Sequence, residues 1–460
     1  MVICDRLAML RTALICLLAL LPLAARAQEA ADTSATAGTP TEILTLEHAV
    51  AVAQANNRQI KIAYQSVLQA HDEILAAKSQ RLPQFNFYLL GSQLLTPISF
   101  DFQQGVLGTV NGQPVPSKST SITTGATPSA LVSGQAVQPL SQLYRLNLNV
   151  HLQETGKKLQ EETLRQQKQQ ITDSVKTAYY NLLQLESGIE ATEESIKSYQ
   201  ELDRATVEYV SQKTALEYQS MGVKTQLAQS QLDLVTLQDN YATQKENLNV
   251  LLGRDIRTDF RASGVPVALP EEMDLAAAQD RALENRSEIR QAQLKEEQAV
   301  FEERIQKSKY IPDVGAAFTY YSPFTSSSFV PKNIASIGFL MTWDVWDWGY
   351  KKHELDEKRR TTEQSRLNIS ETESQVLVDV DNHFRKLREA RAKLSVAQMG
   401  KDTEKEKLRV VLEQYKQKAA LLSTALQEQA NWSQAVTNYQ QALAGFWTAR
   451  ADFEKSLGED

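Results

Sequence analysis

Cysteine and histidine are both scarce in this chain. Its two cysteines are Cys4 and Cys16, so no later residue can form a disulfide or a cysteine metal site. Of its five histidines, none lies three or four residues from another, the spacing that places two imidazoles on one helix face. We therefore expect no metal and no cofactor.

Motifs of enzymes are missing as well. The sequence has no glycine-rich phosphate loop and no nucleophile–base cluster. Its acidic pairs, such as Glu193-Glu194, lie in helical stretches and are most simply solvated surfaces. We expect no enzymatic activity.

Long apolar runs are confined to the N-terminus. Arg6 and Arg11 precede an apolar stretch at residues 13–21, and Ala25-Arg26-Ala27 follows as a cleavage pattern. These are the marks of a secretory signal peptide, residues 1–27, cleaved after Ala27 and without a cysteine for lipidation. No later stretch approaches 18 apolar residues, so a membrane role would depend on strands.

The charge balance argues against nucleic acid as a partner. The whole chain has a formal net charge of −7. The signal peptide carries +2, which leaves about −9 for the mature protein. An excess of acidic residues does not suit a phosphate backbone.

The mature chain consists of two copies of one unit. Residues 46–83 match a segment 229 positions later, and residues after 130 match a segment 205 positions later, up to the C-terminus. The offset changes because the first copy has a longer loop, at 96–129, which is rich in Gly, Pro, Ser and Thr. We assign a first repeat at 28–253, a linker at 254–274 and a second repeat at 275–460.

Each repeat switches between helical and strand periodicity. Apolar residues at three- and four-residue spacing predict helices at 46–82, 144–213, 216–252 and 275–311, and proline is absent from 140–265 and 332–460. Alternating residues predict one strand hairpin within 84–140 and another within 313–345, with four strands of about ten residues. Such strands are long enough to cross a bilayer when tilted.

Three tryptophans mark the junction between the last strand and its long helix. Trp343, Trp346, Trp348 and Tyr350 lie within eight residues. Indole and phenol rings gather at membrane–water boundaries because one end is apolar and the other polar. A small aromatic core at a soluble strand–helix corner is the alternative.

Four strands cannot close a barrel alone, and open edges are not tolerated in lipid. The barrel must therefore be shared between subunits. Two chains would supply eight strands, and three would supply twelve.

The sequence resembles the TolC-like outer-membrane efflux protein family, the trimeric channel-tunnels. The resemblance covers nearly the whole mature chain. It rests on the order and spacing of motifs that are individually weak: LTLEHAVAVAQANNRQIKIA (44–63), Leu82-Pro83, QPL (138–140), WDVWDWG (343–349), and the LG endings at Gly253 and Gly458.

The resemblance implies a mostly α-helical protein in which long antiparallel helical hairpins form a trimeric α-barrel. Four strands per chain would contribute to a shared twelve-stranded β-barrel in the outer membrane, with a large periplasmic extension. The implied partners are two further copies of the chain, outer-membrane lipid, a periplasmic membrane-fusion adaptor and an inner-membrane pump of the RND, ABC or MFS type.

The tips of the helical hairpins are the best candidates for adaptor docking, because their leucines have no evident intrachain core. A contact within the bundle is the alternative. The tip residues are Lys213, Thr214, Ala215, Leu216, Glu217, Lys418, Ala419, Ala420, Leu421 and Leu422. Here the chain departs from the family, since the tip aspartates of some members are absent. Residues that could line the tunnel mouth instead are Gln219, Thr424, Gln427 and Glu428.

Two functions remain open. The first is a passive duct for drugs, small toxic molecules or secreted polypeptides, as the exit of a tripartite efflux pump or a type I secretion system. The second is a non-conducting coiled-coil spacer of the periplasm or cell surface. The loop at 96–129 is expected to be extracellular.

Overall fold

The computed structural model describes residues 42–93, 95–97, 99–123, 128–265, 274–324 and 333–459. The predicted signal peptide and the middle of the linker lie outside these residues. The described part forms two compact units. The small one holds residues 42–43 and 259–261, from the two-stranded sheet of β1 (Glu42–Leu44) and β8 (Phe260–Ala262). All that follows concerns the large unit.

The same order of elements occurs twice, and it confirms the two-repeat, mostly helical fold. The first repeat runs α2 (Leu46–Asn56), α3 (Arg58–Ser79), β2 (Gln84–Gln93), β7 (Pro128–Pro139), α4 (Leu143–Ser211) and α5 (Glu217–Leu252). The second runs α6 (Leu275–Asn285), α7 (Ser287–Ser308), β9 (Asp313–Phe324), β10 (Ile334–Thr342), α8 (Tyr350–Lys416) and α9 (Leu422–Ser456). None of the helices in the described ranges is both long and apolar enough to cross a membrane.

Each repeat begins with two helices where one was predicted. The first breaks at Asn57, whose carboxamide oxygen accepts hydrogen bonds from the backbone N–H groups of Gln59 and Ile60 and so caps α3. The second breaks at Arg286. The apolar spacing continues through both breaks, so periodicity alone could not reveal them.

The reason for the breaks lies in the ends of the return helices. Gly253 ends α5 with φ +70°, and a Cβ there would overlap the carbonyl oxygen of Asn56. Gly458, past the end of α9, has φ +76° and lies in the same way against Asn285. The end of each return helix therefore abuts the break in the first helix pair of its repeat.

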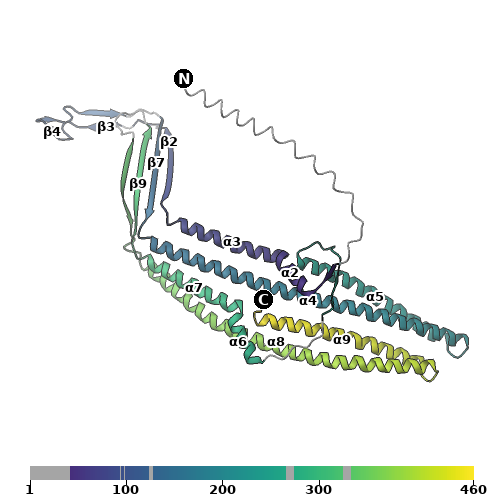
Figure 1. The fold of residues 1–460 in the computed structure, drawn as a ribbon. Helices are drawn as coiled ribbons and strands as arrows, with labels where there is room; N and C mark the ends of the chain where they lie inside the picture. The colour runs from purple at the N-terminus through teal and green to yellow at the C-terminus, as the bar shows by residue number, and fades with distance from the viewer. Residues whose placement is uncertain are drawn as a thin grey trace, which may run out of the picture. The chain divides into compact units, whose positions relative to one another are not determined.

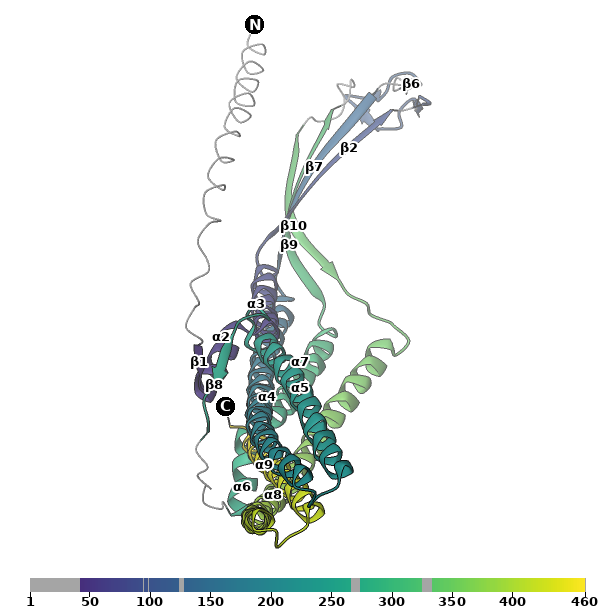
Figure 2. The same cartoon turned by 90° about the vertical axis from the view of Figure 1, so that its right-hand side faces the viewer.

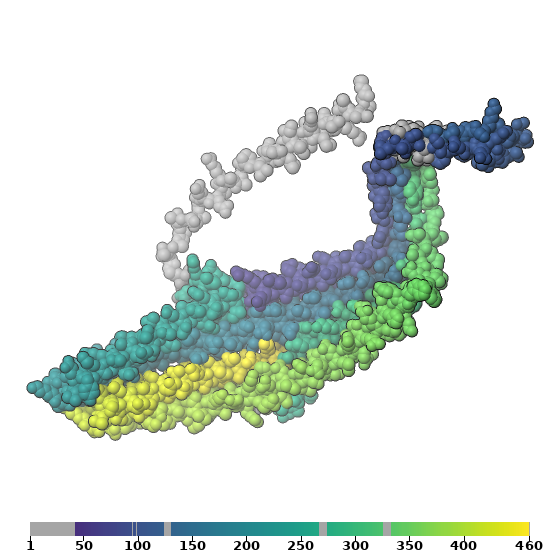
Figure 3. Space-filling model, turned by 180° about the vertical axis from the view of Figure 1, so that it is seen from behind, coloured from purple at the N-terminus to yellow at the C-terminus, as the bar shows by residue number. Residues whose placement is uncertain are grey.

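The helices form a layer in which α4 and α8 are the two long members. Helix α4 contacts α3 and α7 near the strands, and α5 and α9 further along. Helix α8 contacts α7 and then α9. The order across the layer is thus α3–α4–α7–α8 in one half and α5–α4–α9–α8 in the other (Figure 1). In Figure 3 the yellow surface of α9 lies between the teal surface of α5 and the yellow-green surface of α8.

The four long strands form one antiparallel sheet in the order β10–β9–β7–β2. Figure 2 shows this sheet as a twisted ribbon beyond the helices. Its outer strands, β2 and β10, each have a strand neighbour on one side only. Two short hairpins, β3 (Ser99–Phe102) with β6 (Thr120–Thr123) and β4 (Thr109–Val110) with β5 (Gln113–Pro114), occupy the predicted loop.

Candidate functional site

One face of the sheet is mostly apolar, and the other, called the polar face below, carries most of the polar side chains together with some apolar ones. Directly paired residues share a face, so the strand register sorts the side chains. The apolar face carries Phe85, Phe87, Leu89, Val132, Ala136, Val314, Phe318, Ile337, Phe339 and Met341. The opposite face carries the polar residues Asn86, Tyr88, Ser133, Gln135, Thr319, Tyr321, Ser336 and Thr342, together with the apolar Leu90, Leu131, Val137, Ile334 and Leu340. The mostly apolar face suits contact with lipid, and the polar side chains are concentrated on the other face.

The strand–helix corner exposes its aromatic side chains. Trp346 and Trp348 are 74% and 87% exposed and meet edge to face, with ring centroids 5.6 Å apart. Trp343 and Tyr350 are also exposed. The four residues thus form no buried aromatic core in this chain, which favours the membrane-interface interpretation over the soluble corner.

Two aspartates, one through its carboxylate and one through its backbone carbonyl, hold this corner in place. The carboxylate of Asp347 accepts hydrogen bonds from the backbone N–H groups of Gly349 (3.1 Å) and Lys351 (3.2 Å), which caps the start of α8. The ammonium of Lys351 donates to the carbonyl oxygen of Asp344 at 3.1 Å. Trp348 and Gly349 both have positive φ, so the chain reverses sharply between strand and helix.

The two hairpin tips lie at the same end of the helix layer (Figure 1). Lys213 and Lys418 adopt left-handed backbone conformations, with φ 59° and 61°, just past the ends of α4 and α8. Leu216 and Leu421 precede α5 and α9 and are 63% and 73% exposed. Exposed leucines at both tips fit a partner surface.

Leu422 corrects one prediction at the tips. It was grouped with the docking leucines, but it is only 6% exposed and packs with Leu202, Val223, Tyr415 and Ala425. The cluster joins the ends of both hairpins, so Leu422 serves the bundle rather than a partner surface. Sequence equivalence pairs Leu421 with Leu216, which leaves Leu422 opposite Glu217 and without a matching leucine.

Hydroxyl and aromatic contacts tie the two tips together. The hydroxyl of Tyr209 donates to the carbonyl oxygen of Lys416 (3.2 Å), and the hydroxyls of Thr206 and Tyr415 lie 3.1 Å apart. The rings of Tyr209 and Tyr415 meet edge to face, and the ammonium of Lys418 lies 5.1 Å from the Tyr209 ring centroid. The Thr206 hydroxyl donates to the carbonyl oxygen of Leu202 at 2.7 Å, so the Tyr415 hydroxyl is the donor between the two. Burial raises the pKa of Tyr415, which keeps this hydroxyl protonated.

Three of the four residues predicted to line the tunnel mouth make local side-chain hydrogen bonds. The side-chain oxygen of Gln219 accepts from the backbone N–H of Leu216 at 2.9 Å. The amide of Gln427 donates to Asn431, which in turn donates to Glu428 at 3.3 Å. Thr424 is exposed and lies in the first turn of α9.

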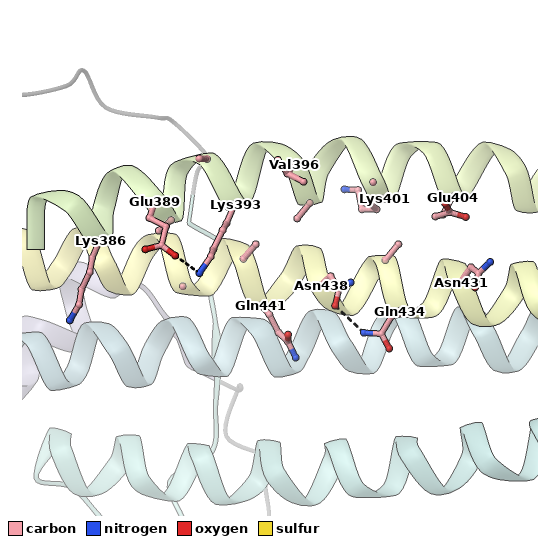
Figure 4. A pocket seen from close by; sticks show the side chains of 17 residues that line it. Lys386, Glu389, Lys393, Val396, Lys401, Glu404, Asn431, Gln434, Asn438 and Gln441 are labelled. Carbon is pink, nitrogen blue, oxygen red and sulfur yellow. Dashed lines mark hydrogen bonds and ion pairs between the residues drawn. The ribbon is translucent and has the colours of Figure 1, made fainter.

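A groove of about 1100 Å³ runs along α8 and α9 (Figure 4). Its floor is made of small residues at heptad spacing, namely Ala390, Ala397 and Gly400 on α8 and Ala435, Ala442 and Gly445 on α9. A Cβ added at Gly400 or Gly445 would meet nothing within 4 Å. Repeated small residues at this spacing were the signal in the sequence that could have revealed the groove.

Charged residues along the groove are held by neighbours. Lys393 pairs with Glu389 at 2.7 Å, and the ammonium of Lys401 lies 3.7 Å from the ring centroid of Tyr439. Such a groove suits a helix with large apolar side chains. Within the described residues, no group of three or more His, Asp or Glu side chains is arranged to hold a metal ion.

The sequence profile of the outer membrane efflux protein family matches residues 49–254 and 278–459. No curated protein sequence matches the chain. Solved structures do. The CmeC outer membrane channel of Campylobacter jejuni superposes with a TM-score of 0.73 at 16% identity, covering 90% of this chain and 85% of that one.

Two further channels give the same result. The outer membrane protein VceC of Vibrio cholerae has a TM-score of 0.70 at 13% identity, covering 90% of this chain and 96% of that one. The MtrE outer membrane channel of Neisseria gonorrhoeae has a TM-score of 0.68 at 15% identity, covering 90% and 89%. The matched family and structures are channels rather than enzymes. The chain thus belongs to the outer membrane efflux protein family, as an efflux channel-tunnel of the outer membrane with a large periplasmic part.

Proposed function

We propose that three copies of this chain form a passive duct that carries solutes across the periplasm and the outer membrane. The observation that carries the proposal is the two-faced sheet with open edges at β2 and β10. In lipid every backbone polar group needs a partner, so both edges must pair with other strands. Strand directions alternate across the sheet, so β10 of one copy can pair antiparallel with β2 of the next. Three copies supply twelve strands.

The edges of the helix layer support the same assembly. Leu367 on α8 is 65% exposed, and it lies about 25 Å along the helix from Tyr350, where α8 begins. Ile62 on α3 is 68% exposed, and it lies about 25 Å along the helix from Ser79, where α3 ends. The two side chains are therefore at the same distance from the strands, on opposite edges of the layer.

A second matched pair lies near the tips. Met399 is 61% exposed, and it lies about 25 Å along the helix from Lys416, the last residue of α8. Val235 is 53% exposed, and it lies about 27 Å along the helix from Glu217, the first residue of α5. One edge of a copy thus suits the other edge of the next, as a closed ring requires.

The helical end of the duct is proposed to meet an adaptor. The exposed Leu216 and Leu421, with the rest of the predicted tip set apart from Leu422, offer an apolar end surface. The groove between α8 and α9 offers a lateral one. The uncharged ties between Tyr209, Thr206 and Tyr415 are proposed to hold the mouth closed, and the mouth residues Gln219, Thr424, Gln427 and Glu428 to line it.

The sheet end is proposed to lie in the membrane. Trp343, Trp346, Trp348 and Tyr350 would mark its periplasmic boundary, because the helices begin there. An inner-membrane pump is the proposed source of cargo, either in a tripartite efflux pump or in a type I secretion system. Drugs, small toxic molecules and secreted polypeptides are the cargo classes.

The proposal is tested by measuring the channel conductance and the particle mass of the same purified protein. Detergent-extracted protein should have the mass of three chains, and it should produce stepwise currents in a planar lipid bilayer. Protein that associates with the bilayer but passes no current, whatever its mass, would instead support the non-conducting spacer.

A further inference from the structure

Two tyrosines lie in one cross-strand row on the polar face of the sheet. Tyr88 on β2 is paired with Ser133 on β7, Ser133 is paired with Tyr321 on β9, and Tyr321 is paired with Ile334 on β10. Residues in one such row point to the same side. The two rings therefore flank Ser133, with their backbones roughly 10 Å apart, or two strand spacings.

Both rings are open to solvent in the single chain. Tyr88 is 59% exposed and Tyr321 is 42% exposed. One step along the strands towards the helices, the next row on this face is Asn86, Gln135, Thr319 and Ser336. The aromatic row thus adjoins a row of amides and hydroxyls.

Charge is missing from this part of the sheet. Among the residues of the four long strands the only ionisable acid or base, apart from the tyrosines, is Asp313, at the helix end of β9. Its carboxylate is paired with Arg145 at 2.9 Å. No fixed cation on these strands therefore opposes a cationic solute here, and the negative faces of the tyrosine rings attract one.

We propose that Tyr88 and Tyr321 line the duct and bind planar aromatic cations in transit. This inference rests on the proposed trimer, which turns the polar face inward. Two tyrosines per chain give six at one level of the lumen. A twelve-stranded barrel has a backbone radius of roughly 12 Å, from strand spacing and tilt, so rings that point inward narrow the passage at this level.

The need for transport limits how tightly these tyrosines can bind a solute. A solute must bind well enough to enter and weakly enough to leave. Each stacking or cation–π contact to an exposed ring strengthens binding only by roughly two- to fivefold. This range suits a transient site and favours planar cations over compact ones of equal charge.

The test is block of single-channel current by ethidium, with tetraethylammonium as the non-planar cation. Wild-type channels should show brief, concentration-dependent block by ethidium and little by tetraethylammonium. The double variant Tyr88→Ala/Tyr321→Ala should weaken ethidium block roughly tenfold and raise the open-channel conductance. Tyr88→Phe/Tyr321→Phe should keep the block, because the rings remain.

Phe87→Ala is the matched control. Phe87 is next to Tyr88 on the same strand but points to the apolar face, so its loss should leave ethidium block unchanged. Equal block of wild type and the double alanine variant, or no block of a conducting wild type, would overturn the tyrosine site while leaving the duct intact. Absence of conductance in the wild type would instead overturn the duct, and the tyrosine site with it.

Discussion

At the scale of single residues, adjacent leucines at one tip have opposite environments. Leu421 is 73% exposed, whereas Leu422 is 6% exposed and belongs to the cluster that joins the two hairpins. The backbone reverses at Lys418, and α9 begins at Leu422. Neighbouring side chains at such a helix start point in different directions. The pair therefore separates a contact with a partner from a contact within the bundle.

The first prediction concerns docking. Leu216→Asp with Leu421→Asp should abolish export while trimers still form. An exposed aspartate stays hydrated in the free protein, but a charge buried without a partner in an interface costs several kcal/mol. Export by intact cells and trimer yield should be measured in the same strain.

Leu422→Asp is the control for that prediction. It places a charge in the shared tip cluster and should lower stability by about 3 kcal/mol, with loss of trimer yield. Normal export by the double tip variant would show that the leucine tips are not the docking surface.

The second prediction concerns Gly253. Gly253→Ala should lower the free energy of unfolding by more than about 2 kcal/mol, because alanine is strained at positive φ and its Cβ would overlap the Asn56 carbonyl. Gly222→Ala, in the exposed face of α5 with open space around it, should be neutral or stabilise by up to about 1 kcal/mol. Thermal unfolding in detergent compares the two, and equal midpoints would contradict the close contact.

At the scale of elements, the sequence predicted the long helices and strands to within a few residues. The helix predicted at 144–213 is Leu143–Ser211, and the one predicted at 216–252 is Glu217–Leu252. Long periodic stretches without proline leave little choice of structure. The face of each strand also follows from simple alternation.

Features that depend on contacts distant in sequence were not predictable in this way. The break at Asn57 depends on the approach of Gly253, which lies at the far end of the same repeat. The row of Tyr88, Ser133 and Tyr321 depends on strand register, which alternation alone does not set. The groove along α8 and α9 could not be predicted because it forms only when the two helices lie side by side.

The third prediction concerns the β4–β5 hairpin. Its turn is Asn111-Gly112, and both residues have positive φ, as tight two-residue hairpins require. An epitope inserted there should be tolerated, since exposed turns accept insertions, and antibody should label it on intact cells. Labelling only after permeabilisation would reverse the proposed orientation. The same epitope inserted between Lys213 and Thr214, at a helix tip, should be labelled only after permeabilisation.

At the scale of the whole molecule, the open edges of the sheet and of the helix layer can both be covered by neighbouring copies of the chain. Within the described residues β2 and β10 each pair with one strand, and exposed apolar residues stand at equal distances from the strand-side ends of α3 and α8. A single ring of copies would cover both kinds of edge.

The fourth prediction tests that ring directly. The double variant Ile62→Cys/Leu367→Cys should give covalent trimers on mild oxidation, because each cysteine meets its counterpart on the next copy. Background is low, since Cys4 and Cys16 lie in the predicted signal peptide. Denaturing electrophoresis without reductant gives the readout.

Ile62→Cys/Val378→Cys is the matched control for the crosslink. Val378 is 66% exposed on the same helix, but it lies about 16 Å further along α8 than Leu367. The control variant should therefore remain monomeric on denaturing electrophoresis after the same oxidation. Equal crosslinking by both pairs would show that the helix edges do not meet at the proposed height.

The breaks at Asn57 and Arg286 have a mechanical consequence. Only α4 and α8 continue from the strands to the tips, while α3 with α5, and α7 with α9, meet end to end without a shared helical backbone. A bend of the tip half therefore need not pull on the strands through α5 or α9. In each copy α4 and α8 are therefore the continuous helical connections between strands and tips within the described residues, whereas α5 and α9 reach the strand-side helices through packing at Gly253 and Gly458.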